Sequence, residues 1–274
     1  MSPVNRNILL FVVCVGLLSG CGGRHKRGGY YEGDGPPKRS NVDIDAIPDA
    51  RPTGEGLSRY GNKTYSVNGK TYHPIRSARH YKERGVASWY GKKFHGRRTS
   101  NGEVYDMYRM SAAHRTLPLP SFLRVTNLAN ARSVVVRVND RGPFYDNRLI
   151  DLSYAAAHRI GVLATGTALV ELQGVSGESN AGLESGAPRS LDYAGGAPQL
   201  YLQVGAFISR ANAERLRLRL EQAQLGPVVI QMARSGARKV HRVRIGPLNS
   251  VTQGDDLAEK VSHQGFVNAR LVVE

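Results

Sequence analysis

The sequence contains very little cysteine, the residue that cross-links small exported domains and binds many structural metals. Its 274 residues include only two cysteines and one tryptophan. It has neither a CxxC pair nor an HExxH motif, so nothing supports a zinc centre, and we expect no metal and no cofactor. No apolar run reaches the roughly 20 residues that a membrane-spanning helix needs. These absences exclude the metalloenzyme and helical membrane-protein classes as first interpretations.

Acidic residues are also scarce. The chain has 22 Asp and Glu residues against 38 Lys and Arg, which gives a formal net charge of +16. A basic chain favours an acidic partner, which could be nucleic acid, anionic lipid or a glycan that carries carboxylates. Part of the charge also serves solubility, so charge by itself does not choose among these partners.

The N-terminus has the pattern of an export signal. Arg6 precedes an apolar run at 8–18, and the following LSGC resembles the lipobox of bacterial lipoproteins. We therefore expect residues 1–20 to be a lipoprotein signal peptide and Cys21 to carry the lipid that anchors the mature chain to a membrane. The next residue is Gly22 rather than Asp, which under the enterobacterial sorting rule predicts the outer membrane.

Composition and periodicity divide the mature chain into four parts. Residues 21–82 are expected to be a flexible tether, whose hairpin signal at Asn68-Gly69 predicts two short strands that pack on the next domain. Short apolar or alternating runs between 83 and 174 predict a small closed barrel with one helix from Tyr154 to Ile160. Residues 175–196 have the composition of a linker.

Residues 197–274 show the clearest periodicity. The order of strand and helix patterns is βαββαβ, with Ser209 capping a helix whose apolar face holds Ala213, Leu216, Leu220 and Ala223. This order predicts a ferredoxin-like domain, with two helices on one face of an antiparallel sheet. The same order occurs in RNA-binding RRM domains, but the third strand, KVHRVRIG, lacks their stacking aromatics. We therefore expect no nucleic-acid partner.

Unusual polar residues gather in four stretches of the middle domain: ASWYGKKFHGRRTSNGEVYDM, SAAHRTLPLP, NDRGPF and IDLSYAAA. Their order and spacing closely resemble the rare lipoprotein A family, and the resemblance runs from the lipobox to a C-terminal segment similar to the sporulation-related (SPOR) domain. The fold that this implies is a six-stranded double-psi β-barrel followed by a small ferredoxin-like βαββαβ SPOR domain. The implied activity is that of a lytic transglycosylase of the bacterial cell wall.

The resemblance places the catalytic centre on three motifs. Asp140 corresponds to the family's groove acid, while Glu103 and His114 come from other loops. Glycosidic cleavage needs a proton for the departing oxygen and stabilisation of positive charge on the sugar. We expect Asp140 to act as general acid and then base, with Glu103 as the alternative acid or a substrate contact. His114 either orients a carboxylate or sugar hydroxyl, or is a satisfied structural histidine.

Four nearby residues are candidates for substrate binding in the barrel, each with a structural alternative. Asp106 lines the groove or is merely solvated. Arg141 pairs with Asp140 or binds the lactyl carboxylate of the substrate. Trp89 and Tyr90 offer faces on which sugars stack, or they fill the barrel core.

Strand alternation predicts a glycan-binding face on the C-terminal sheet. Leu202 and Val204 should face the helices, which leaves alternate residues of the first and third strands on the open face. The predicted glycan-binding residues of this SPOR-like domain are Tyr201, Gln203, Phe207, Asn212, Leu216, Arg242 and Arg244, of which Leu216 is equally a core candidate.

The resemblance also implies a substrate and a location. We expect the chain to cleave the MurNAc–GlcNAc bond of peptidoglycan strands, to prefer strands without stem peptides, and to leave 1,6-anhydro-MurNAc ends. The expected location is the outer membrane, facing the periplasm and enriched at the division septum, where the chain would act in daughter-cell separation. Division-machinery proteins are further candidate partners. Because the same barrel occurs in expansins, the alternative is a non-catalytic, expansin-like glycan-binding lipoprotein.

Overall fold

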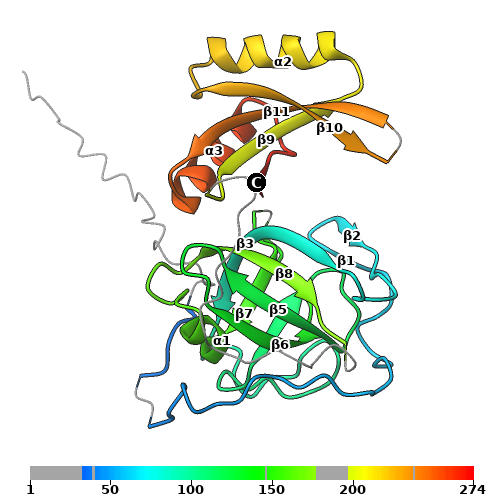
Figure 1. Cartoon of the computed structure of the whole chain (residues 1–274), viewed down its shortest axis with the longest axis vertical. Coiled ribbons are helices and arrows are strands. Elements are labelled where there is room, and N and C mark those ends of the chain that lie inside the picture. Colours follow the sequence, from blue (N-terminus) through cyan, green and yellow to red (C-terminus); the bar gives the residue numbers. More distant parts are fainter. Residues whose placement is uncertain (1–32, 39–40, 146, 177–196, 237) are drawn as a thin grey trace, which may run out of the picture.

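The computed structural model describes residues 33–38, 41–145, 147–176, 197–236 and 238–274. The predicted signal peptide, Cys21 and nearly all of the predicted linker lie outside these residues. Figure 1 shows a β-barrel with an N-terminal segment running along it, and a separate domain of sheet and helices above it. Among the described residues, no helix has the length and apolar character needed to cross a membrane.

The barrel closes in the order β3-β7-β4-β6-β5-β8. Its strands are β3 (Lys82–Tyr90), β4 (Ser111–His114), β5 (Ser121–Asn127), β6 (Ser133–Asp140), β7 (Ile150–Ser153) and β8 (Ala168–Gly174). The pairs β3·β7 and β4·β6 are parallel, and the other pairs are antiparallel. The six-stranded barrel is confirmed. Helix α1 (Tyr154–Arg159) follows β7, and the Ser153 hydroxyl caps it by accepting from the Ala156 amide at 3.2 Å.

Strand β6 shows why this sequence closes into a barrel. Val134, Val136 and Val138 are buried in the core cluster, as alternate residues on the inward face of a strand should be. β-Branched side chains suit this position because they pack well on a pleated surface. Alternation leaves Arg137 and Asn139 on the other face of the same strand. The strand therefore supplies both the core and a polar surface.

The N-terminal segment is more ordered than its composition suggests. The expectation of a flexible tether is wrong for its described part, because Ile44 is buried in the barrel core cluster. The Arg159 guanidinium donates to the Ile44 carbonyl at 3.1 Å and also to the carbonyl of Ile47. Farther upstream, the buried Asp34 carboxylate accepts from the Gly91 amide at 2.7 Å. Long-range contacts of this kind leave no periodic signal in a Gly- and Pro-rich sequence.

The predicted hairpin is present. Strands β1 (Tyr65–Val67) and β2 (Lys70–Tyr72) pair antiparallel around Asn68 and Gly69, which have φ values of 50° and 74°. Two positive φ values in succession are what a tight hairpin turn requires. The Tyr65 hydroxyl donates to the Arg115 carbonyl at 2.8 Å, so the hairpin packs on the barrel as expected.

The C-terminal domain has the predicted βαββαβ order. Its elements are β9 (Leu200–Phe207), α2 (Arg210–Gln222), β10 (Val228–Ser235), β11 (Arg238–Leu248), α3 (Val251–His263) and β12 (Arg270–Val273). The antiparallel sheet has the order β10-β11-β9-β12. Ala213, Leu216 and Leu220 of α2 are buried against it, as the apolar spacing predicted.

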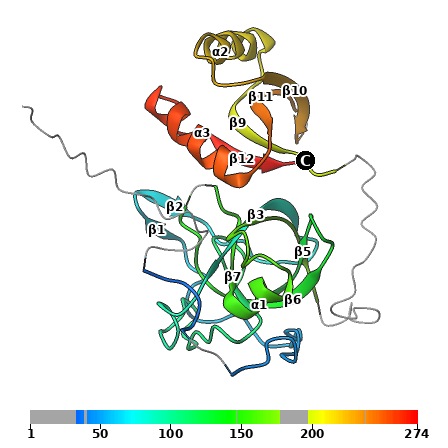
Figure 2. The same ribbon diagram turned by 90° about the vertical axis from the view of Figure 1, so that its left-hand side faces the viewer.

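The C-terminal domain contacts the barrel directly. In Figure 2, α3 and β12 lie on the side of that domain nearest the barrel. The Arg148 guanidinium donates to the Asp255 carboxylate at 2.8 Å, and the Leu271 amide donates to the Asn147 side chain at 3.2 Å. A small apolar cluster joins Val86 and Leu128 of the barrel to Leu200, Val251 and Val273. The two domains therefore meet along a polar and apolar contact.

Candidate active site

The candidate site begins at a tight turn between Thr99 and Glu103. The Thr99 amide donates to the Glu103 carbonyl at 2.8 Å. Gly102 has a φ of 93°, which favours glycine at this position. The Asn101 side-chain oxygen accepts from the Glu103 amide at 3.1 Å and from the Thr99 hydroxyl at 2.7 Å. The turn therefore holds the Glu103 backbone in one place.

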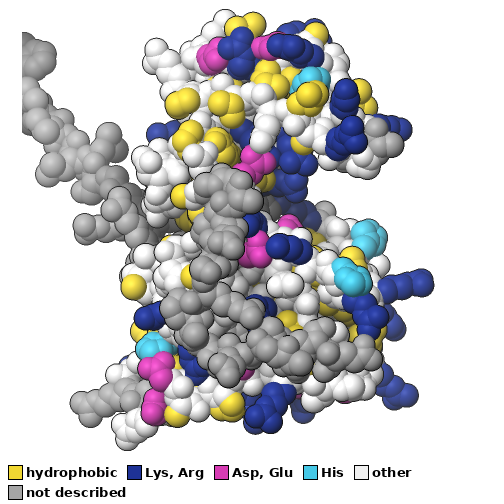
Figure 3. Space-filling model, viewed as in Figure 1, with side chains coloured by type: hydrophobic (Ala, Val, Ile, Leu, Met, Phe, Trp, Pro, Cys, Tyr) yellow, Lys and Arg dark blue, Asp and Glu magenta, His cyan; other side chains and the backbone are white. Residues whose placement is uncertain are grey.

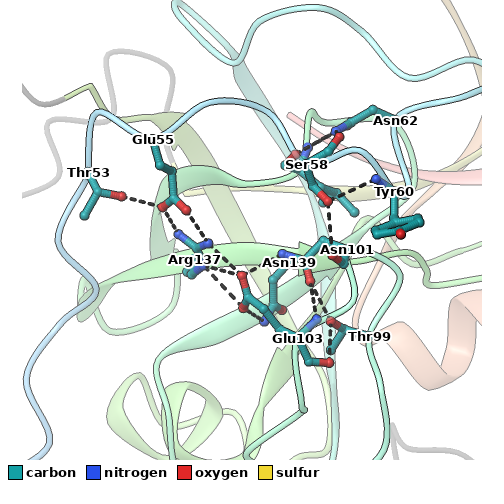
Figure 4. A network of polar contacts seen from close by, with 11 residues as sticks. Thr53, Glu55, Ser58, Tyr60, Asn62, Thr99, Asn101, Glu103, Arg137 and Asn139 are labelled. Atoms are coloured by element: carbon teal, nitrogen blue, oxygen red, sulfur yellow. Dashed lines mark hydrogen bonds and ion pairs between the residues drawn. The ribbon is translucent and has the colours of Figure 1, made fainter.

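The Glu103 carboxylate lies against the outward face of β6 (Figure 4). Arg137 donates to it from Nη2 at 2.7 Å and from Nε at 3.2 Å, and the Asn139 and Asn101 amides donate at 2.9 and 2.7 Å. Burial would raise the pKa of Glu103, but the hydrogen bonds from Arg137, Asn139 and Asn101 outweigh it and lower the pKa. Glu103 is therefore held as a carboxylate.

Asp140 contacts the same turn from the end of β6. Its Oδ1 accepts from the Ser100 amide at 2.8 Å, the Ser100 hydroxyl at 2.6 Å and the Arg141 amide at 2.8 Å. All three bonds end on Oδ1, so none of them occupies Oδ2. The Asn101 amide donates to the Asn139 carbonyl at 3.3 Å, which ties the turn to this strand end. The turn thus connects to both predicted acids, because Glu103 is its last residue and Ser100 holds Asp140.

His114 follows Ala113, which pairs with Asp140 across β4 and β6, but the printed contacts of its side chain are with other residues. Its side chain is buried, its Nδ1 accepts from the Thr116 and Leu117 amides at 3.1 and 3.0 Å, and its Nε2 lies 3.1 Å from the Tyr81 hydroxyl. Burial and nearby arginines lower the pKa of His114 to about 3, so the ring is neutral. Because Nδ1 accepts two bonds, the ring proton lies on Nε2. These contacts favour the structural alternative for His114.

Arg141 departs from both roles that the sequence suggested. Its buried guanidinium donates to the carbonyls of Gly61 at 2.8 Å, His114 at 3.0 Å and Leu117 at 2.6 Å. Its contact with Asp140 is made by the backbone amide. The guanidinium thus connects its own strand end to the segments around Gly61 and around 114–117. With its N–H groups bound to carbonyls, it fits neither an ion pair with Asp140 nor binding of a substrate carboxylate.

The aromatic candidates are interior residues. Trp89 and Tyr90 are 2% and 4% exposed. Trp89 belongs to the barrel core beside Tyr154, with ring centroids 5.8 Å apart, and Tyr90 stacks on Tyr105 at 4.2 Å. Neither ring presents a face to a sugar, so the geometry supports the core alternative for both. Asp106 is half-exposed.

A cavity of about 960 Å³ opens beside Glu103. The N-terminal segment and the barrel both line it. The segment contributes Ile47, Pro48, Ala50, Arg51 and Glu55, and the barrel contributes, among others, Glu103, Asp106, Arg109, Phe122, Arg137 and Asn139. Asp140 is not part of the lining, although it directly follows Asn139. In the described part of the chain, no three His, Cys, Asp or Glu side chains gather closely enough to hold a metal ion.

The structure adds residues that the sequence reasoning missed. Ser100 holds Asp140, while Arg137 and Asn139 hold Glu103. Alternation along β6 could have placed the last two on one face, because three valines of that strand point inward. Glu55 also reaches Arg137, and no local pattern in the sequence marks it.

The open face of the C-terminal sheet holds a buried arginine. Arg244 lies opposite the helices, as predicted, but it is only 2% exposed. Its guanidinium contacts the Gln203, Gln231 and Glu274 side chains, with Nη1 2.6 Å from the Glu274 carboxylate. Arg244 is therefore on the predicted face, but the expectation that it is available to a ligand is wrong, because neighbouring polar side chains enclose it.

The other predicted glycan-binding residues divide between surface and core. Tyr201 and Arg242 are half-buried, and Asn212 is exposed at the start of α2. Leu216 is buried in the core of the domain, and Phe207 packs against that core. The geometry thus supports the core alternative for Leu216 and places Phe207 on the helix side of the sheet.

Comparisons with known proteins match both domains in the same order. A family model described as "Lytic transglycolase" matches residues 82–172, and one described as "SPOR domain" matches residues 197–270. The "Endolytic peptidoglycan transglycosylase RlpA" of Vibrio cholerae is 40% identical over 266 residues, which cover 96% of this chain and 95% of that protein. The protein of the same name from Pseudomonas aeruginosa is 40% identical over 262 residues, covering 78% and 76%.

A solved structure is also similar in sequence to the C-terminal part. It is the "Crystal structure of RlpA SPOR domain from Pseudomonas aeruginosa", which is 33% identical and covers 27% of this chain and 96% of that chain, with a TM-score of 0.25. Identity of 40% over nearly the full length of the Vibrio cholerae protein, with both domain models in order, shows that this chain belongs to the RlpA family of endolytic peptidoglycan transglycosylases.

Proposed function

We propose that the protein is a lytic transglycosylase that cleaves the MurNAc–GlcNAc bond of peptidoglycan and prefers strands without stem peptides. The observation that carries the proposal is that one turn includes Glu103, which lines a large cavity, and also holds Asp140 through Ser100. The family match supplies the reaction class. Lys and Arg side chains are spread over both domains on the face shown in Figure 3, which suits a polymer with free carboxylates.

The chemistry divides between the two carboxyl groups. Asp140 gives a proton from Oδ2 to the glycosidic oxygen as the bond from that oxygen to C1 of MurNAc breaks. The C6 hydroxyl oxygen of the same sugar then bonds to C1, and its proton returns to Asp140. Glu103 stays ionised and stabilises the positive charge that develops on the sugar ring. The products are a 1,6-anhydro-MurNAc end and a free GlcNAc hydroxyl, and no water is consumed.

The proposed location is the outer membrane at the division septum. Cys21 carries the lipid anchor, and Gly22 at the next position directs the lipoprotein to the outer membrane. The C-terminal domain then concentrates the enzyme at the division septum, beside partners of the division machinery. A Cys21→Ala variant is expected to accumulate as an unlipidated precursor. Release of the wild-type mature protein from membranes without detergent would contradict the anchor.

Product analysis tests the activity. The soluble chain, lacking residues 1–21, is incubated with glycan strands with and without stem peptides, and the products are identified by mass spectrometry. Anhydro ends are expected, with faster release from stripped strands. Reducing ends would indicate a hydrolase, and binding without any product would indicate the expansin-like alternative.

A further inference from the structure

Arg137 presents two different edges to two different carboxylates. The edge that includes Nε faces Glu103, with Nη2 at 2.7 Å. The outer edge, formed by Nη1 and Nη2, faces Glu55 in a two-pronged contact, with Nη2 at 2.9 Å. A planar fork of this kind matches the geometry of a carboxylate. Figure 4 shows Arg137 between the two acids.

The barrel by itself fixes the guanidinium in place. Its carbon lies 5.5 Å from the centroid of the Phe122 ring, a cation–π contact. Glu103 is in turn held by Asn101 and Asn139. The outer edge of Arg137 is therefore already oriented by barrel residues, whether or not Glu55 is present.

Glu55 comes from a segment that is poorly attached between its two ends. One end is held by the Ala50 amide, which donates to the Val135 carbonyl at 3.0 Å, and the other by the Ser58 amide, which donates to the Leu119 carbonyl at 2.8 Å. Between them, residues 53–57 are all exposed and form no regular structure. Gly54 and Gly56 flank Glu55, and a Cβ at either would meet nothing within 4 Å. This short stretch can move away while both ends stay bound.

We propose that Arg137 is a specificity-determining residue that binds the free lactyl carboxylate of MurNAc, and that Glu55 occupies the same edge until a glycan strand displaces it. The inference rests on the proposed function and gives its preference for stripped strands a chemical cause. Both carboxylates use the same two N–H groups, so the exchange replaces one ion pair by another. The cavity beside this edge, about 960 Å³, lies within the usual range of ligand sites.

Stem peptides remove the group that Arg137 recognises. A stem peptide converts the lactyl carboxylate into an amide, which is neutral and cannot accept two parallel charged hydrogen bonds. Loss of a charge-assisted pair of this kind typically weakens binding by about 10- to 100-fold. Selection for stripped strands thus follows from one guanidinium edge in the barrel, independently of the C-terminal domain.

The test uses three substrates: stripped strands, stripped strands whose lactyl carboxylates are converted to methylamides, and strands with stem peptides. Methylamides remove the charge without adding the bulk of a peptide. For the wild type, kcat/KM is expected to fall about 10- to 100-fold from the first substrate to the second. Arg137→Lys keeps the positive charge but loses the fork, so this ratio should collapse toward one. Arg132→Lys, at the exposed residue just before the same strand, serves as the matched control and should keep the wild-type ratio.

A second variant tests the role of Glu55 as the residue that occupies the outer edge of Arg137, and it leaves Glu103 unchanged. Glu55→Gln should lower KM for stripped strands about two- to fivefold, as expected for loss of an exposed competing ion pair, with kcat unchanged. It should leave KM for methylamide strands as it is. Anhydro products from the wild type establish the proposed function separately. If they form while the Arg137→Lys ratio and the Glu55→Gln KM stay at wild-type values, the inference alone is wrong.

Discussion

Arg137 of the barrel and Arg244 of the C-terminal sheet are similarly placed but differently enclosed. Each lies on the strand face that points away from its core, and each meets a carboxylate from a distant segment, Glu55 or Glu274. The side chain of Arg137 is 23% exposed and borders a cavity, whereas that of Arg244 is 2% exposed. Burial of the guanidinium, more than its position on a strand, therefore distinguishes an arginine that can bind substrate from one that holds its own domain together.

Electrostatics gives the physical reason. A half-exposed ion pair in water contributes little to stability, so exchanging one of its partners for a ligand costs little. When a buried arginine loses its partners, the guanidinium and the partner groups remain out of water without hydrogen bonds. Exchange of such partners for a ligand is therefore unfavourable. Five substitutions and one control test the roles of the two domains.

Asp140→Asn should separate chemistry from binding most clearly. The change is nearly isosteric and removes only the proton donor, so the rate of anhydro-product formation should fall by about two to four orders of magnitude. Binding of the same variant to peptidoglycan should remain at the wild-type level. Product mass spectrometry and sacculus pull-down measure the two effects. Near wild-type turnover would move the acid role to Glu103.

Arg244→Ala should destabilise the C-terminal domain. It leaves Gln203, Gln231 and Glu274 without their shared donor, and breaking an enclosed pair typically costs about 3–5 kcal/mol. Arg137→Ala, by contrast, should lower the stability of the barrel by less than about 1 kcal/mol. Hydrogen exchange of the β9 and β11 amides reports the first effect. Fluorescence of Trp89, the one tryptophan and a barrel residue, reports the second during urea unfolding. Equal losses in both variants would remove the distinction between the two arginines.

His114 should make the barrel sensitive to acid. Burial lowers the pKa of His114 from its ordinary value of 6.5 to about 3, so between these limits the unfolded chain binds a proton that the folded chain does not. Stability should therefore be fully present above pH 6.5 and fall below it, by up to about 1.4 kcal/mol per pH unit. Asp151 has the opposite effect on stability. Burial raises its pKa from 3.8 to about 6, so its contribution to stability falls as the pH rises between these values.

A variant isolates the histidine contribution. His114→Asn keeps an acceptor for the Thr116 and Leu117 amides but cannot titrate. The difference in unfolding free energy between wild type and variant, followed by Trp89 fluorescence in urea, should shrink from pH 6.5 to pH 5. Asp151 is present in both proteins and cancels. Parallel stability curves would show that His114 does not carry this effect.

Arg242→Ala should have the smallest effect. Arg242 is half-buried on the same sheet face as Arg244, so it is the more accessible of the two arginines for glycan. Loss of one charge-assisted contact should weaken binding to amidase-treated sacculi about two- to tenfold without changing stability. Lys260→Ala, an exposed residue of α3, is the matched control. Undiminished binding would remove this part of the sheet face from the glycan site.

The two domains also differ in how far their sequences predicted them. In the C-terminal domain, the apolar spacing of Ala213, Leu216 and Leu220 and the alternation around Leu202 were enough to predict every element. In the barrel, the short apolar and alternating runs predicted only a small closed barrel, because strands such as β4 and β7 have four residues each, too few for a clear periodic signal. The six-stranded double-psi form was expected through the family resemblance. Asp140 and Glu103 were named by the same resemblance, and the structure brings both to one turn.

Periodicity in the sequence was sufficient for the longer strands and helices, because the alternation of apolar and polar side chains is a local property that burial of one face imposes. Only the tertiary structure decided which polar groups meet. Glu55 and Arg137 are 82 positions apart, and Arg244 and Gln203 are 41 apart. Whether an arginine borders a cavity or is buried among glutamines depends on which distant segments pack against it. Contacts between residues so far apart in the chain leave no local pattern in the sequence.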